Sequence, residues 1–122
     1  MNITSKIRER SGTAQRKQDL LEGIIAYVDE HLEGRITLQM VAEHFHVSVS
    51  TVTQLFQHRT STTFHGFLTE RRMAAAEVLI RDGVPLEEVG KRVGYTDHSS
   101  FYRAFRQFHG VSPREFKLNK KE

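Results

Sequence analysis

Residues 86–116, with the sequence LEEVGKRVGYTDHSSFYRAFRQFHGVSPREF, decide the fold. Their apolar residues recur at intervals of three or four, as on the buried face of a helix; they are Leu86, Val89, Val93, Phe101, Phe105 and Phe108. Gly94 interrupts this pattern, and Thr96 or Asp97 can cap a second helix. Residues 112–115, SPRE, have the pattern of a capping box with proline at the first helical position. The stretch therefore predicts a short helix, a tight turn, a longer helix and the start of a third.

The same pattern occurs once more, 48 residues earlier in the chain. Leu38, Val41, Ala42 and Phe45 correspond at this offset to Leu86, Val89, Gly90 and Val93. After the turn the offset is 49 residues, and Val52, Thr53, Gln54 and Phe56 correspond to Phe101, Tyr102, Arg103 and Phe105. Thr37 and Ser48 are the expected helix caps of the first pair. Two short helices around a tight turn, the second with an exposed polar face, form the helix-turn-helix pattern, in which the second helix enters the major groove of DNA.

Three further segments complete the predicted architecture. Residues 1–18 are polar and basic without an apolar period, and we predict a flexible arm or linker there. From Asp19 to near Gly34 the apolar residues again follow a helical stripe, and residues 64–82 form a longer helix that Gly83 can end. The sequence thus predicts an all-α protein of seven helices, with a first helix-turn-helix lobe at residues 19–63, a connecting helix at 64–82 and a second lobe at 83–122.

Composition excludes several classes of protein. The chain has 122 residues and no cysteine, and it contains no apolar run near the roughly 20 residues that span a bilayer. Its start, MNITSKIRER, lacks the apolar centre of a secretory signal. We therefore expect a cytoplasmic protein with no membrane partner. A small two-lobed helical plan does not suggest a convergent nucleophile, base and pocket, so neither enzyme activity nor a cofactor is expected.

Charge is unevenly distributed along the chain, although the formal net charge is only +3. Residues 1–18 and residues 60–121 each carry a net charge of +4, residues 19–59 carry −4, and Glu122 makes up the remainder. A basic carboxy-terminal half favours a polyanionic partner, although a solvated charged surface accounts for such numbers in many small proteins.

Residues 19–117 resemble the DNA-binding domain of the AraC/XylS family of bacterial transcription regulators. The most specific part is RRMAAAEVLI at residues 71–80 followed by residues 86–116, with their spaced apolar residues, glycine-aromatic turn and final serine-proline. The resemblance implies homeodomain-like lobes whose second helices, the third and sixth of the chain, enter adjacent segments of the major groove. The helix at 64–82 is expected to span roughly 28 Å, close to the approximately 34 Å between successive major-groove faces.

The resemblance also implies base-reading residues, which are Ser50, Thr53 and Gln54 in the first lobe and His98, Ser99, Tyr102 and Arg103 in the second. Arg103 is the strongest candidate because its guanidinium can donate two hydrogen bonds to guanine, and Gln54 can pair with adenine. The expected phosphate contacts are Thr51, Arg59, Arg71, Arg106 and Arg114, with Arg72, Lys91, Arg92 and Lys117 as further possibilities. For the hydroxyl residues of the first lobe, an ordinary role on the helix surface is an equally good interpretation.

The first lobe departs from the family pattern. His46 occupies the turn position that Gly94 has in the repeat, so a left-handed backbone there carries a modest strain. Gln57 and His58 stand where basic residues are common after the first recognition helix, which removes phosphate contacts. We therefore hypothesise that the second lobe supplies most of the electrostatic affinity and that the first mainly tunes the choice of sequence.

Other interpretations stay open at this point. His44 and His46, with His58 and His65 further along, invite a metal site, but the chain has no cysteine and no HExxH pair, and no metal is expected. The chain can instead be the DNA-binding portion of a longer effector-responsive regulator, or a protein-interaction module that titrates another regulator. As a stand-alone family member it is expected to bind promoter operators as a monomer. It would then activate transcription by contacting RNA polymerase, and repress where its site overlaps the promoter.

Overall fold

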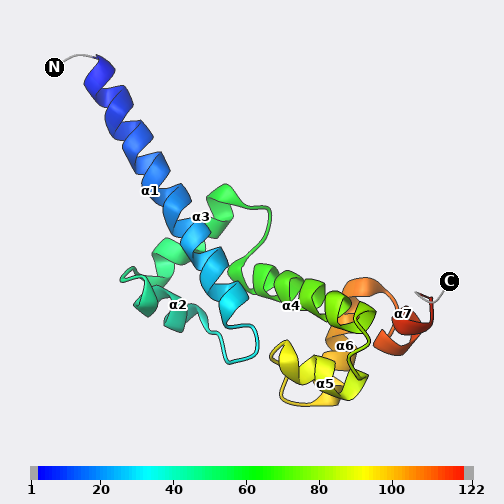
Figure 1. Cartoon of the computed structure of the whole chain (residues 1–122). Helices are drawn as coiled ribbons and strands as arrows, with labels where there is room; N and C mark the ends of the chain where they lie inside the picture. The colour runs from blue at the N-terminus through cyan, green and yellow to red at the C-terminus, as the bar shows by residue number, and fades with distance from the viewer. Residues whose placement is uncertain (1–2, 120–122) are drawn as a thin grey trace. The chain divides into compact units, whose positions relative to one another are not determined.

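A computed structural model describes residues 3–119, with side chains from residue 12 onward. Over these residues the chain forms seven α-helices and no strand (Figure 1), which confirms the predicted all-α class. In order they are α1 (Ile3–Glu30), α2 (Leu38–His44), α3 (Val49–Arg59), α4 (Phe64–Arg81), α5 (Leu86–Arg92), α6 (His98–His109) and α7 (Pro113–Asn119). They form two compact units. Unit 1 comprises the described residues up to 30 and residues 37–64, and unit 2 comprises residues 31–36 and the described residues from 65 onward.

Helix α1 is longer than the sequence predicts. It begins at Ile3, so residues 3–18 are helical and do not form the expected irregular arm, whose first two residues lie outside the described part of the chain. This segment has no proline and is rich in lysine, arginine and glutamine, which favour helices. Hydrogen bonds along the helix, such as Gln15 Nε2 to Asp19 Oδ1 (2.9 Å), support it without an apolar stripe. Neither α1 nor any other helix within residues 3–119 combines the length and apolarity needed to cross a membrane.

Unit 1 is built from α1, α2 and α3. Its buried apolar residues come from all three helices and from the start of α4; they are Leu21, Ile24, Val28, Val41, Ala42, Val52, Leu55, Phe56 and Phe64. Both expected caps are confirmed. Thr37 Oγ1 accepts the Met40 N–H (3.1 Å), and Ser48 Oγ accepts the Thr51 N–H (3.0 Å). Because these bonds satisfy N–H groups that have no partner inside the helix, they define where α2 and α3 begin.

The turns of the two units each contain one left-handed residue. The φ angle is 56° at His46 and 96° at Gly94, which confirms the equivalence predicted from the repeat. In both turns the N–H of the next residue donates to a carbonyl five residues earlier, at 3.0 Å in unit 1 and 2.9 Å in unit 2. Glycine has a second reason to occupy position 94, because a Cβ there would lie 2.3 Å from the Leu32 carbonyl oxygen. The left-handed backbone is therefore strained at His46 in unit 1, whereas Gly94 adopts it in unit 2 without this strain.

We expect His46→Gly to raise the free energy of unfolding by about 0.5–1 kcal/mol. Glycine removes the steric cost of the left-handed backbone, and its greater freedom in the unfolded chain offsets part of that gain. Urea unfolding followed by circular dichroism measures the change. His46→Ala is the matched control, since it shortens the exposed side chain but keeps the strain, and should change stability little. A lower stability for His46→Gly than for His46→Ala contradicts the strain argument.

Helix α4 belongs to unit 2 and is not the separate connecting segment that the sequence predicts. It shares one apolar core with α5 and α6, formed by Met73, Ala76, Ile80, Val89, Val93, Phe101 and Phe105. The reason is burial of apolar surface. The α4 side chains in this core are at most 3% exposed, and they are shielded from water because α5 and α6 pack against them. The helix ends as predicted at Gly83, whose φ of 85° allows the left-handed C-terminal turn.

Residues 31–36 also pack on unit 2. Arg72 Nη2 donates to the Gly34 carbonyl (3.1 Å), and the guanidinium carbon of Arg72 lies 5.7 Å from the centre of the Tyr95 ring. Burial lowers the pKa of Arg72, while the nearby Tyr95 acts in the opposite direction. Arg72, one of the further possibilities for a phosphate contact, thus holds this loop against Tyr95 and the turn at Gly94.

Phe108 is not a core residue, contrary to the sequence prediction. Its exposed fraction is 47%, whereas Phe101 and Phe105 are fully buried. The buried stripe of α6 continues at His109, whose ring centre lies 4.2 Å from that of Phe105 and whose Nδ1 lies 3.8 Å from Glu77 Oε1. Positions three and four residues along a helix are both close to the same face, so spacing alone does not choose between them. Phe108 was predicted to be buried because phenylalanine is apolar, and this prediction is wrong.

Helix α7 completes unit 2. Ser112 Oγ accepts the Glu115 N–H (3.1 Å) and donates to Glu115 Oε1 (3.3 Å), which confirms a side-chain cap at the predicted position. Phe116 then packs edge-to-face against Phe105, with ring centres 5.5 Å apart. The last helix thus packs onto the aromatic core of unit 2 through Phe116.

Candidate nucleic-acid interface

The outward face of α6 carries all four residues predicted for base reading in the second lobe. His98, Ser99, Tyr102 and Arg103 together line one shallow depression. All except the half-buried Tyr102 are exposed. They face outward because Phe101 and Phe105 occupy the opposite, buried face of the same helix. The first two turns of α6 therefore present hydroxyl, imidazole and guanidinium groups side by side.

Asp97 determines where this face begins. Its Oδ1 accepts the backbone N–H of Ser100 (2.7 Å), and its Oδ2 accepts the Ser100 hydroxyl (3.0 Å). These hydrogen bonds, followed by the positive charge of Arg103, hold the pKa of the Asp97 carboxyl below its usual value. Asp97 thus remains a carboxylate in the folded protein at neutral pH, and the sequence prediction of a cap at Asp97 or Thr96 is resolved in favour of Asp97.

The Asp97 cap makes stability depend on pH in one direction. Because its pKa is lower in the folded than in the unfolded chain, its contribution is fully present above the unfolded value, about 3.9, and is lost as pH falls below it. We expect the wild type to unfold at a higher temperature than Asp97→Asn at pH 6, since asparagine caps without a charge. This difference should shrink toward pH 3 in thermal unfolding. A difference that stays constant across this range contradicts the assignment.

The outward face of α3 carries the corresponding residues of unit 1. Ser50, Thr53 and Gln54 are exposed, while Val52, Leu55 and Phe56 form the buried side of the helix. Thr51, a predicted phosphate contact, is also exposed, and its hydroxyl lies 2.9 Å from Ser48 Oγ within the cap. Compared with α6, this face is made of shorter and uncharged side chains.

The predicted phosphate contacts lie on several helices. Arg106 and Arg114 are exposed on α6 and α7. Arg71 is half-buried, with its guanidinium carbon 5.9 Å from the centre of the Phe67 ring. Arg59 is exposed at the end of α3, where its Nη1 donates to Gln18 Oε1 (3.2 Å). The five residues, Thr51 included, are therefore distributed over α3, α4, α6 and α7.

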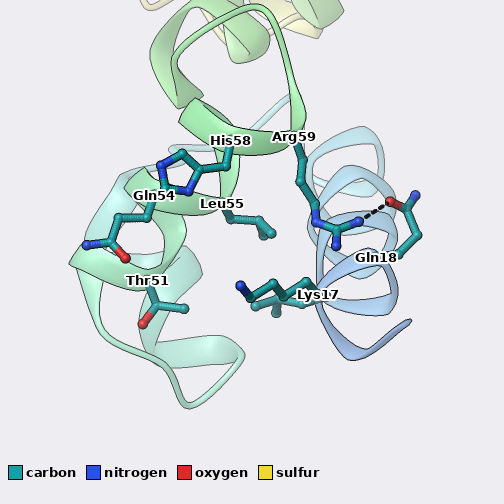
Figure 2. A pocket seen from close by; sticks show the side chains of 8 residues that line it. Lys17, Gln18, Thr51, Gln54, Leu55, His58 and Arg59 are labelled. Carbon is teal, nitrogen blue, oxygen red and sulfur yellow. Dashed lines mark hydrogen bonds between the residues drawn. The ribbon is translucent and has the colours of Figure 1, made fainter. Parts of the chain in front are cut away.

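Sequence reasoning missed the residues of α1 that lie beside α3. Lys17 and Gln18 line a groove together with residues of α3 (Figure 2), although the sequence analysis places both in a flexible arm. The available signal was the absence of proline from residue 3 to residue 30, where only Gly12 and Gly23 weaken the helix. Because α1 is continuous, the packing of its apolar residues in unit 1 also places Lys17 and Gln18 beside α3.

His44, the centre of the metal hypothesis, has a packing role at the end of α2. Its ring lies 4.5 Å from the ring of Tyr27 and 4.8 Å from that of Phe45, measured between centres. Within the part of the chain that the structure describes, no three histidine, aspartate or glutamate side chains gather as metal ligands do.

Two units that each place a short helix, a tight turn and a second helix with an exposed polar face define a protein of the helix-turn-helix class. A family model described as a helix-turn-helix domain matches residues 41–119. The chain belongs to the AraC-type family of helix-turn-helix transcription regulators and contains its DNA-binding domain. The expected resemblance is thereby confirmed.

Individual relatives agree with this assignment. The HTH-type transcriptional regulator YijO of Escherichia coli K-12 is 32% identical over 106 residues, which are 86% of this chain and 38% of the relative. The C-terminal domain of AraT, a response regulator from Geobacillus stearothermophilus, has a TM-score of 0.78 and 28% identity over 82% of this chain and 84% of that domain. The DNA-binding domain of the transcriptional factor AdpA, in complex with a target DNA, shares the fold (TM-score 0.75, 24% identity, 82% and 90% coverage). The chain spans 31–38% of the length of YijO and four other curated relatives.

Proposed function

We propose that the chain binds double-stranded DNA at specific promoter operators, with α3 and α6 as the helices that enter the major groove. The observation that carries this proposal is the division of α6 into a buried aromatic side and an exposed side of four polar residues. Arg103, on the exposed side, is the group best suited to select a base, because its two N–H groups match guanine O6 and N7. Gln54 on α3 has the corresponding match to adenine N6 and N7.

One chain is proposed to read two adjacent groove segments. The support is the internal repeat, which gives each unit one such helix. A monomer would then contact two adjacent segments of the major groove without requiring a second copy.

Charge supports a division of labour between the two units. Unit 2 carries twelve basic and nine acidic residues, counted over residues 31–36 and 65–122, and Arg106 and Arg114 are exposed there. Phosphate contacts dominate affinity and its salt dependence, whereas base contacts supply specificity. Unit 2 is therefore proposed to provide most of the electrostatic affinity and unit 1 mainly to adjust sequence preference.

The regulatory outcome is proposed to be activation through contact with RNA polymerase, and repression where the operator overlaps the promoter. This rests on the family assignment, and transcription assays on a promoter that contains the selected operator test it. The proposal holds equally if the chain acts alone or within a longer effector-responsive regulator, since the DNA-reading surface is the same in both cases.

Selection of bound duplexes from a random DNA pool tests DNA binding directly. We expect an enriched motif with two conserved segments spaced by about one helical turn, roughly 10 base pairs. A single enriched segment contradicts the two-helix reading. No enrichment at all, together with capture of another regulator, favours the protein-interaction module instead.

A further inference from the structure

A groove in unit 1 lies between α1 and α3 (Figure 2). Its lining comes from two segments more than thirty residues apart in the chain, and consists of Lys17, Gln18 and Leu20 from α1 and Thr51, Gln54, Leu55, His58 and Arg59 from α3. Figure 2 shows the Lys17 side chain extending from α1 toward α3, on the side where Thr51 and Gln54 lie. A base-reading candidate, Gln54, and two cationic side chains therefore share one groove.

The groove is positively charged. Lys17 and Arg59 are exposed cations within its lining, and no aspartate or glutamate is among the lining residues. Arg59 is positioned by a neutral group, because its Nη1 donates to Gln18 Oε1 (3.2 Å), and Gln18 Nε2 in turn donates to Glu22 Oε1 (3.3 Å). The amide of Gln18 thus orients the guanidinium of Arg59 without neutralising it within the groove.

The fold changes the charge balance that the sequence suggests for this half of the protein. Residues 19–59 alone carry −4, but unit 1 also includes the amino-terminal part of α1. Over residues 1–30 and 37–64 there are six basic and six acidic residues, so the unit is neutral overall. Its acidity is therefore cancelled by a segment that the sequence analysis treats as a separate arm, and Lys17 of that segment lines the groove beside α3.

We propose that this groove is a clamp for the DNA backbone, in which Lys17 of α1 and Arg59 of α3 bind phosphates next to the base read by Gln54. The inference rests on the proposed function and deepens it. Phosphate rows flank the major groove on both sides, so cations beside a groove-bound helix meet the backbone and fix its register. Lys17 then supplies the phosphate contact that Gln57 and His58 do not provide at the end of α3.

Neutralising Lys17 tests the clamp against a matched control. Lys17→Gln and Arg16→Gln remove one positive charge each from adjacent positions of α1, but Arg16 is not among the residues that line the groove and its Nη2 donates to Thr13 Oγ1 (3.3 Å). Both residues are exposed, so both variants should fold, and thermal unfolding verifies this. Binding to a duplex selected by the unmodified protein is then measured by fluorescence anisotropy over a range of salt concentrations.

We expect Lys17→Gln to weaken binding about five- to tenfold at 0.1 M salt and to reduce the salt slope by about one unit, equally for matched and mismatched duplexes. Lys17→Arg should restore most of this loss, and Arg16→Gln should bind as the unmodified protein does. Ethylation of backbone phosphates should interfere with binding next to the base whose selection changes in Gln54→Ala, and this interference should disappear in Lys17→Gln.

Two results overturn the clamp while the proposed function stands. One is Lys17→Gln binding with unchanged affinity and salt slope, and the other is an equal loss in Arg16→Gln, which indicates a general effect of charge on α1. If the unmodified protein binds no duplex from the random pool, the proposed function and the clamp both fall. The first measurement in the series therefore separates the two failures.

Discussion

Arg103→Ala is expected to weaken binding to the selected operator by about 1–3 kcal/mol, roughly 5- to 150-fold, and to relax the choice of base at one position. The reason is geometric. Arg103 is exposed on the face of α6 opposite the buried Phe101 and Phe105, and its planar guanidinium can donate two hydrogen bonds to a single guanine. Binding of the variant to the full set of single-base operator mismatches measures both the loss of affinity and the loss of selectivity.

Two comparisons separate base reading from charge. Arg103→Lys keeps the positive charge but loses the planar guanidinium that donates two hydrogen bonds to one guanine. It should therefore lose most of the base selectivity while keeping the salt slope. Gln54→Ala should cost less affinity than Arg103→Ala at every salt concentration, because unit 2 is proposed to carry most of the electrostatic affinity. A larger loss of affinity for Gln54→Ala contradicts that ordering. If Arg103→Lys keeps full base selectivity, Arg103 contacts a phosphate and not a base.

Phe105→Ala is expected to lower the free energy of unfolding of unit 2 by about 3–5 kcal/mol. Phe105 is fully buried, and its ring centre lies 5.8 Å from that of Phe101 and 5.5 Å from that of Phe116. Removing the ring leaves a cavity where α4, α6 and α7 meet and eliminates these aromatic contacts. Urea unfolding monitored by circular dichroism should show the helices of unit 2 unfolding first, and DNA binding should weaken in parallel.

Phe108→Ala is the control for this prediction. The two residues lie on the same helix and lose the same side chain, but Phe108 is 47% exposed and is absent from the core of unit 2. Its substitution should change the free energy of unfolding by less than about 1 kcal/mol. Equal destabilisation by the two substitutions contradicts the placement of α6, since it requires Phe108 to be buried as the sequence analysis expects.

Local chemistry made much of the fold predictable. Helix caps at Thr37 and Ser48, and a third at Thr96 or Asp97, could be predicted because a side-chain oxygen and a nearby N–H are neighbours in sequence. The left-handed turn at His46 followed from its alignment with Gly94, which is a comparison within the chain. The exposed face of α6 followed from the spacing of its buried residues. Each of these inferences needs only a few consecutive positions or one internal copy.

The errors concern packing between distant segments. Whether Phe108 or His109 faces the core depends on where α4 and α7 lie, and α6 alone does not determine this. The contacts of Arg72 with the Gly34 carbonyl and the Tyr95 ring were not predicted, because both partners are far from it in sequence. The groove beside α3 was missed for the same reason, since Lys17 contributes to it only if α1 continues unbroken.

The docking of residues 31–36 on unit 2 means that the chain enters that unit twice, once between α1 and α2 and again after Phe64. A fragment cut at residue 65 would lose the hexapeptide whose Gly34 carbonyl accepts from Arg72, and the Gly94 turn would lose the neighbour that excludes a Cβ. The two units are thus interleaved along the chain, so gene fusions and domain exchanges that transplant unit 2 must include residues 31–36.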